Sequence, residues 1–147
     1  MPSLVDEAIA FNNNGLLLEW TVEFLLSSGG NDDLAKGLIT QSKGLVMTLG
    51  LHPLQELRRS LGPEPNMRYW RDTHEWENHV LAMCQSLSAG WIPAPLIISL
   101  EAQKSASIRE MLNSSVSLIL DGNHRHEALM RAGYTEYWAI TCLGLQL

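Results

Sequence analysis

The stretch LILDGNHRHEALMRAGY, residues Leu118–Tyr134, decides the fold of this chain. It begins with three aliphatic residues, passes through Asp121-Gly122 into four polar residues, and ends in a helical pattern that reaches about Ala132. The pattern predicts a strand, a sharp turn at a glycine, and a helix that stops at a left-handed Gly133.

The mouth of this helix has the geometry of an anion site. The first backbone N–H groups of a helix have no partner within the helix, and with the helix dipole they favour phosphate. Gly122 allows a ligand to approach closely, and Asn123, His124 and Arg125 follow it in the first turn. Asp121, at the end of the strand, is placed to hold a metal or a hydroxyl group. The alternative is a plain turn and helix cap whose histidine and arginine side chains only face solvent.

The composition fits one domain with one hydrophobic core, because 46% of the 147 residues are hydrophobic. The net charge of −6 argues against a surface for nucleic-acid phosphate, although a small basic site stays open. Six of the seven arginines form three groups: Arg58 with Arg59, Arg68 with Arg71, and Arg125 with Arg131. There is no apolar run of membrane-spanning length, no basic secretory signal region, and no paired cysteine spacing. We therefore expect a cytoplasmic protein with reduced thiols and no membrane span.

Residues 1–44 are predicted to form a helical extension. The pattern indicates helices over residues 3–11, 16–26 and 32–42, with Ser3 as the first N-cap. The segment carries six acidic residues against two lysines, whereas a DNA-reading helix-turn-helix is usually basic. We interpret it as a cap on the core; the alternative is an element for binding a protein partner or for self-association.

Residues 45–147 are predicted to form the core domain. Strands are expected over residues 45–49, 96–100, 116–120 and 137–142, and residues 101–112 read as polar and partly helical. A loop or short helix is expected from His52-Pro53, because Leu54, Leu57 and Leu61 follow at helical spacing. The order of elements predicts an α+β fold with a small mixed sheet and packed helices.

The strongest helical pattern covers Thr73–Ser88, with Thr73 as the expected N-cap. Its apolar stripe is expected to pack in the core, and it consists of Trp76, Val80, Met83, Cys84 and Leu87. Cys84 is accordingly interpreted as a buried, inert thiol rather than a nucleophile.

The motif DGNHRHEALMRAG resembles the phosphate-binding motif of the ParB/sulfiredoxin superfamily. It is most similar to the Asp-Gly-x-His-Arg version of the free-serine-kinase branch and of ParB-like nuclease-annotated proteins. The similarity covers about residues 45–143, and it is specific at the motif and loose at LHPLQELRR upstream. The resemblance implies a ParB/sulfiredoxin-like core that binds the phosphates of ATP or another nucleotide through Gly122, Asn123, His124 and Arg125.

Three departures from the superfamily narrow this implication. Asn123 stands where sulfiredoxin has its catalytic cysteine, so sulfinic-acid reductase activity is not expected. The ParB arginines fall at His124 and Glu127, so the CTP pattern of the partition proteins is poor. No helix-turn-helix pattern follows the motif before Leu147, which disfavours a centromere-binding role.

The kinase-like branch also has a His-Glu pair before its main helix, and Thr73-His74-Glu75 stands at that place. The resemblance implies Glu75 as general base and His74, with Arg68, as a contact to substrate or phosphate. The alternative is that Glu75 only interacts favourably with the helix dipole.

The motif's own side chains form a poor metal site, because residues two apart on a helix do not share a face. A nucleotide-bound Mg²⁺ that uses one carboxylate, Asp121 or Glu75, fits better. His126 is expected to point elsewhere, and Arg131 to act as a cation at the C-terminal end of the helix.

Three functions stay open, in this order. The first is NTP hydrolysis or phosphotransfer to a small hydroxyl substrate. The second is a non-catalytic interaction or regulatory module. The third is a ParB-like metal-dependent DNase, which the negative net charge disfavours.

Overall fold

The computed structural model describes residues 2–65, 67, 72–101 and 116–146. The helices are α1 (Leu4–Asn13), α2 (Leu17–Phe24), the π-helix η1 (Leu25–Gly29), α3 (Asp32–Thr40), the 3-10 helices η2 (Ser42–Gly44) and η3 (Leu54–Glu56), α4 (Thr73–Ser88) and α6 (Asn123–Arg131). The strands are β1 (Val46–Pro53), β2 (Leu57–Arg58), β3 (Leu96–Glu101), β4 (Val116–Asp121) and β5 (Glu136–Leu143).

The strands form one mixed sheet in the order β1-β5-β3-β4-β2. β1 pairs with β5 and β3 pairs with β4 in the antiparallel sense, whereas β3 with β5 and β2 with β4 are parallel. The central strand β3 is buried on both faces, as its uninterrupted apolar sequence from Leu96 to Ile98 requires. The α+β fold with a small mixed sheet is therefore confirmed.

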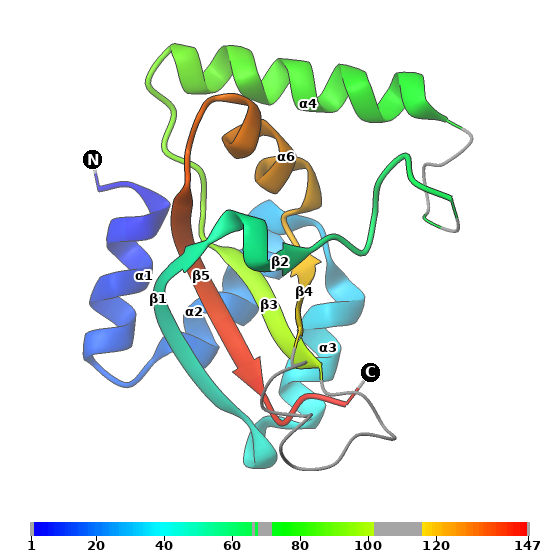
Figure 1. Ribbon diagram of the computed structural model, residues 1–147. Coiled ribbons are helices and arrows are strands. Elements are labelled where there is room, and N and C mark those ends of the chain that lie inside the picture. The colour runs from blue at the N-terminus through cyan, green and yellow to red at the C-terminus, as the bar shows by residue number, and fades with distance from the viewer. Residues whose placement is uncertain (1, 66, 68–71, 102–115, 147) are drawn as a thin grey trace.

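α2 and α3 cover one face of the sheet, α1 packs against both core clusters, and α4 and α6 lie together at one end of the sheet (Figure 1). Ser3 caps α1 through a capping box with Asp6, as expected for the N-cap. Trp20 of α2 and Leu38 of α3 share a core cluster with Ile97 and Ile140 of the sheet. The three helices thus bury the sheet as a cap does, and a domain boundary near residue 45 stays a prediction.

A second cluster fills the opposite face of the sheet and supports α6. Leu129 of α6 packs there with Leu57, Ile98 and Ile119. On its other side, α6 packs Ala128 against Trp76 and Val80 of α4, with Met83, Cys84 and Leu87 partly buried beside them. The predicted apolar stripe of α4 is confirmed, and it holds the helix that carries the motif.

The loop or short helix expected from His52-Pro53 is the 3-10 helix η3, and the helical spacing of the leucines does not continue beyond it. Pro53 closes β1, η3 follows, and Leu57 then pairs with Ser117 of β4 as a short parallel strand. The buried position of Leu57 and its pairing with the sheet override the helical spacing of the leucines. β1 is also longer than residues 45–49, because it pairs with β5 from Val46 to Pro53.

Two further differences concern the helices. The N-cap of α4 is Asp72 rather than Thr73, since the Asp72 carboxylate accepts the N–H of Glu75 at 3.0 Å. Of the segment predicted to be polar and partly helical, residues 102–112 lie outside the described residues. Within the described ranges, no helix is long and apolar enough to cross a membrane.

Candidate functional site

The motif forms the junction of β4 and α6. Gly122 is the N-cap of α6 in a left-handed conformation, with φ of 106°, and no side chain caps the first turn. A Cβ at this position would lie 2.8 Å from Nη2 of Arg125 and 2.8 Å from Cδ2 of Leu96. Glycine is therefore required both by the backbone conformation and by the side chains that pass close to it.

Arg125 turns inward instead of facing the mouth of the helix. Its Nη2 donates to the carbonyl oxygen of Pro95 at 3.0 Å and to Oδ2 of Asp121 at 3.4 Å. Its guanidinium lies 5.7 Å from the ring centroid of Phe24. Burial lowers the pKa of Arg125, and the charge of Asp121 opposes that shift. The pair joins α6 to the end of β4 and to the turn before β3.

Asp121 is engaged on both sides. Its other oxygen, Oδ1, accepts a hydrogen bond at 3.3 Å from the side chain of Asn31, the N-cap of α3. The side chains of Asp121 and Arg125 each keep only 12% of their exposure. Among the described residues, no group of three His, Cys, Asp or Glu side chains is placed to hold a metal. Asp121 as a metal ligand or catalytic residue stays a prediction.

The side chain of Asn123 joins the segment after β2 to the start of α6 by hydrogen bonds. The side chain is only 3% exposed, and its Oδ1 accepts the backbone N–H groups of Ser60 at 2.8 Å and Leu61 at 3.1 Å. Its Nδ2 donates to Oγ of Ser60 at 3.2 Å, and that hydroxyl donates to the carbonyl oxygen of Ile119 at 2.6 Å. The position that would carry a thiol in sulfiredoxin thus holds a buried, hydrogen-bonded asparagine.

His124, like Ala128 further along α6, packs against α4. Its ring centroid lies 4.5 Å from that of Trp76 and 5.0 Å from that of His79. The first turn of α6 therefore lies under α4, beside an exposed histidine of that helix.

Two of the remaining predicted residues, His74 and Glu75, lie in the first turn of α4. Glu75 is exposed in the first turn of α4, and no contact described here joins it to the motif. His74 lines a cavity of about 460 Å³ together with Arg59, Trp76 and Arg131. Arg68 lies outside the described residues.

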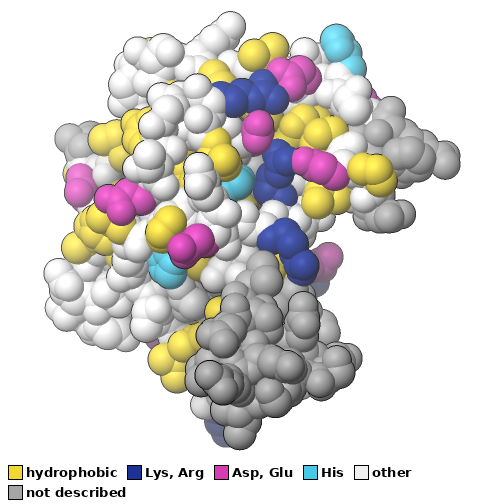
Figure 2. Space-filling model, in the orientation of Figure 1, with side chains coloured by type: hydrophobic (Ala, Val, Ile, Leu, Met, Phe, Trp, Pro, Cys, Tyr) yellow, Lys and Arg dark blue, Asp and Glu magenta, His cyan; other side chains and the backbone are white. Residues whose placement is uncertain are grey.

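A second cavity, of about 320 Å³, lies beside the first and shares its wall of Arg59, Glu64 and Glu127. Arg59 pairs with both carboxylates, and Arg131 of α6 bridges Glu127 at 3.3 Å and Glu77 of α4 at 2.5 and 2.7 Å. Figure 2 shows basic and acidic side chains next to each other on one face of the molecule. The sequence pointed to Arg59 only through its pairing with Arg58, and nothing in it indicated a cavity.

His126 lines the smaller cavity and is only 5% exposed. Its Nε2 lies 2.8 Å from the carbonyl oxygen of Leu54, which can only accept, so the neutral ring carries its proton on Nε2. Burial lowers the pKa of His126, while the hydrogen bond to Leu54 opposes the shift. The expectation that His126 points away from the mouth of the helix agrees with this position.

Comparisons with known proteins find a structural neighbour. No family model matches the sequence, and no curated protein matches it significantly. A search of solved structures finds a Pnob8-like ParB-N domain, with a TM-score of 0.39 and 14% sequence identity. The match covers 69% of this chain and 31% of that protein. Its name is that of the superfamily that the motif resembles, and a likeness of this size carries no functional conclusion.

Proposed function

We propose that this protein binds a nucleotide through its phosphate groups, and that the phosphates lie at the first turn of α6. The observation that carries the proposal is the left-handed Gly122 at the N-cap, which leaves the first-turn N–H groups of a nine-residue helix without a side-chain cap. These donors and the positive end of the helix dipole favour an anion. His124, in the same turn, adds a ring donor at the edge of α4.

In this proposal the other motif side chains hold the turn in place. Asn123 fixes the segment after β2 against α6, and Arg125 with Asp121 fixes the end of β4. A turn that is held by buried hydrogen bonds loses little conformational entropy when a ligand binds. Arg125 therefore supports the site from behind, and the backbone supplies most of its attraction for phosphate.

NTP hydrolysis and phosphotransfer are a further step of the proposal. They require a carboxylate near the terminal phosphate, for which Glu75 is the candidate, because both oxygens of Asp121 are already hydrogen bonded. Mg²⁺ would then be bound mainly by phosphate oxygens. The release of phosphate from ATP by the wild type, and its loss in Glu75→Gln, tests this step separately from binding.

Calorimetric titration of the protein with ATP, ADP and CTP at low salt tests the binding proposal. We expect saturable binding of at least one nucleotide, and several-fold weaker binding by His124→Gln because one donor at the turn changes. His52→Gln is the matched control, because His52 lies in β1 and contacts Thr141 of β5. The absence of binding by the wild type for all three nucleotides would contradict the proposal.

Protein binding through the N-terminal helices is a second candidate function. A groove of about 260 Å³ between α1 and α2 is lined by Glu7, Phe11, Trp20 and Glu23, and Phe11 is exposed. Two carboxylates beside aromatic rings suit a basic partner segment. Size-exclusion chromatography with light scattering, on the wild type and on Phe11→Ser, tests self-association through this groove.

A DNase activity is tested by metal-dependent nicking of plasmid DNA.

A further inference from the structure

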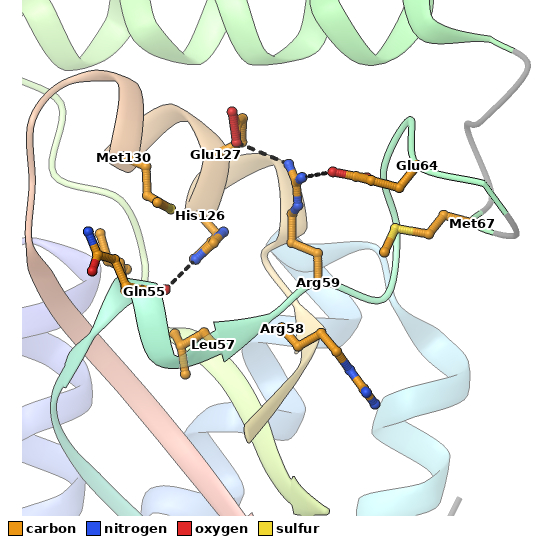
Figure 3. Close-up of a pocket in the computed structure, with 10 residues that line it drawn as sticks. Gln55, Leu57, Arg58, Arg59, Glu64, Met67, His126, Glu127 and Met130 are labelled. Carbon is orange, nitrogen blue, oxygen red and sulfur yellow. Dashed lines mark hydrogen bonds and ion pairs between the residues drawn. The ribbon is translucent and has the colours of Figure 1, made fainter. Parts of the chain in front are cut away.

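The smaller cavity lies between the segment 54–59 and α6, on the side of the helix that faces away from α4 (Figure 3). Its wall is formed by Leu54, Gln55, Leu57, Arg58, Arg59, Glu64, Met67, His126, Glu127 and Met130. A volume of about 320 Å³ has room for a molecule of on the order of ten non-hydrogen atoms. Nothing in the proposed binding of phosphate uses this cavity.

Two acceptors in this wall have no hydrogen bond to any described residue. One is Nδ1 of His126, which is buried and carries a lone pair because the proton is on Nε2. The other is Oε2 of Glu64, which is also buried. Figure 3 shows the second ring nitrogen of His126 on the edge of the ring away from the bond to Leu54. A buried acceptor without a donor is unfavourable, so a ligand that supplies a donor binds more tightly than one that does not.

The charges in the wall balance each other. Arg59 donates to Glu127 at 3.0 Å and is also paired with Glu64. Glu127 is also paired with Arg131, so each carboxylate of the wall has a cation beside it. Figure 3 shows the Arg58 side chain pointing away from His126. The uncharged part of the wall includes the polar Gln55 and His126 and apolar side chains such as Leu57 and Met130. A charged ligand would have to displace an ion pair, whereas an uncharged one would not.

We propose that this cavity binds a small uncharged molecule that has an apolar part and a hydroxyl group, and that the hydroxyl donates a hydrogen bond to Nδ1 of His126. The apolar part lies against Leu57 and Met130, which Figure 3 shows on the same side of Arg59 as His126. Gln55, which is exposed, stands at the edge of the cavity. The site is independent of nucleotide binding, and it follows from the acceptor, the balanced charges and the apolar wall.

Four probes with the same ring test the ligand chemistry: benzyl alcohol, benzyl methyl ether, benzylammonium and benzoate. Binding is followed by NMR through the ring nitrogens of His126. We expect benzyl alcohol to shift Nδ1 and to bind about tenfold more tightly than the ether, since one hydrogen bond to a buried acceptor is worth about 1.4 kcal/mol. Equal binding of the ether, tighter binding of either charged probe, or no shift with any probe at tens of millimolar overturns the proposal.

Variants test the place of binding. His126→Leu removes the acceptor and abolishes the preference for the alcohol over the ether. Gln55→Trp fills the edge of the cavity from an exposed position and leaves His126 unchanged, so it removes binding even if His126→Leu does not fold. His52→Gln, outside the cavity wall, is the control and binds benzyl alcohol as the wild type does. Undiminished binding by Gln55→Trp places the probe elsewhere and contradicts the proposal.

Discussion

The first turn of α6 and the later part of the same helix use arginine in opposite ways. Arg125 is buried, donates to a backbone carbonyl and to Asp121, and lies against an aromatic ring. Arg131 is partly exposed and joins two carboxylates in a surface network. A buried pair supports the fold when both members are present, whereas a surface pair in high dielectric adds little. Arg125, although it stands in the motif, thus stabilises the junction of β4 and α6.

The largest effect is expected from breaking the buried pair. Arg125→Met leaves Asp121 without its cation, and removal of one member of a buried pair costs about 3 to 5 kcal/mol. Urea denaturation followed by circular dichroism measures the change in the free energy of unfolding. The double variant Arg125→Met with Asp121→Leu should recover much of the loss. A single variant within 0.5 kcal/mol of the wild type would contradict the structural role of Arg125.

The second largest loss of stability is expected from removing the hydrogen bonds of the Asn123 side chain. Asn123→Ala leaves the N–H groups of Ser60 and Leu61 without their acceptor, and we expect a loss of about 2 kcal/mol. The same denaturation experiment decides, and a loss within about 0.5 kcal/mol would contradict a structural role of this acceptor.

The junction of β4 and α6 could be predicted from the sequence, but the directions of its side chains could not. An aliphatic run, a glycine and a helical pattern with a glycine stop determine strand, turn and helix locally. That Arg125 faces Pro95 and Asn123 faces Ser60 depends on segments about 30 and 63 residues away in sequence. Periodicity carries no information on such distant contacts, so the sequence assigned both residues to the ligand.

The cavity beside His126 could not be predicted for a related reason. Leucine spacing after Pro53 suggested a helix, whereas pairing with β4 makes a short strand that places Leu57 and Arg59 opposite α6. The α4 stripe, by contrast, was predicted correctly, because one helix face determines it. Its N-cap was displaced by one residue, since Asp72 and Thr73 are both good caps.

A third prediction concerns the pH dependence of stability, to which the buried His126 and the surface carboxylate of Glu77 contribute in different pH ranges. The pKa of His126 is lowered in the folded protein, so the unfolded chain binds a proton more readily and stability falls as pH falls below about 6.5. The slope is at most about 1.4 kcal/mol per pH unit. The lowered pKa of Glu77 acts in the same direction at lower pH, below about 4.5. Thermal denaturation of His126→Gln should show a smaller slope between pH 5 and 6.5, and an unchanged slope would contradict a buried neutral ring.

The smallest effect is expected from the surface network. Arg131→Ala removes the bridges from α6 to Glu77 and Glu127, whose partners remain accessible to water. We expect a change near the detection limit of urea denaturation, which disappears at 1 M salt because the exposed charges are screened. A loss of unfolding free energy as large as that of Arg125→Met would contradict the claim that the buried arginine stabilises the fold more than the surface arginine does.

Binding of phosphate by the backbone of α6 is tested most directly by titrating isotopically labelled protein with tripolyphosphate at low salt, followed by NMR. Tripolyphosphate carries the anionic chemistry of the nucleotide without its base. We predict saturable shifts of the backbone N–H signals of Asn123, His124 and Arg125, while the side-chain Nε signal of Arg125 keeps its position. A shift of that Nε signal without shifts of the three backbone signals, or no shift at all, would contradict the claim that the backbone of α6 binds the phosphate.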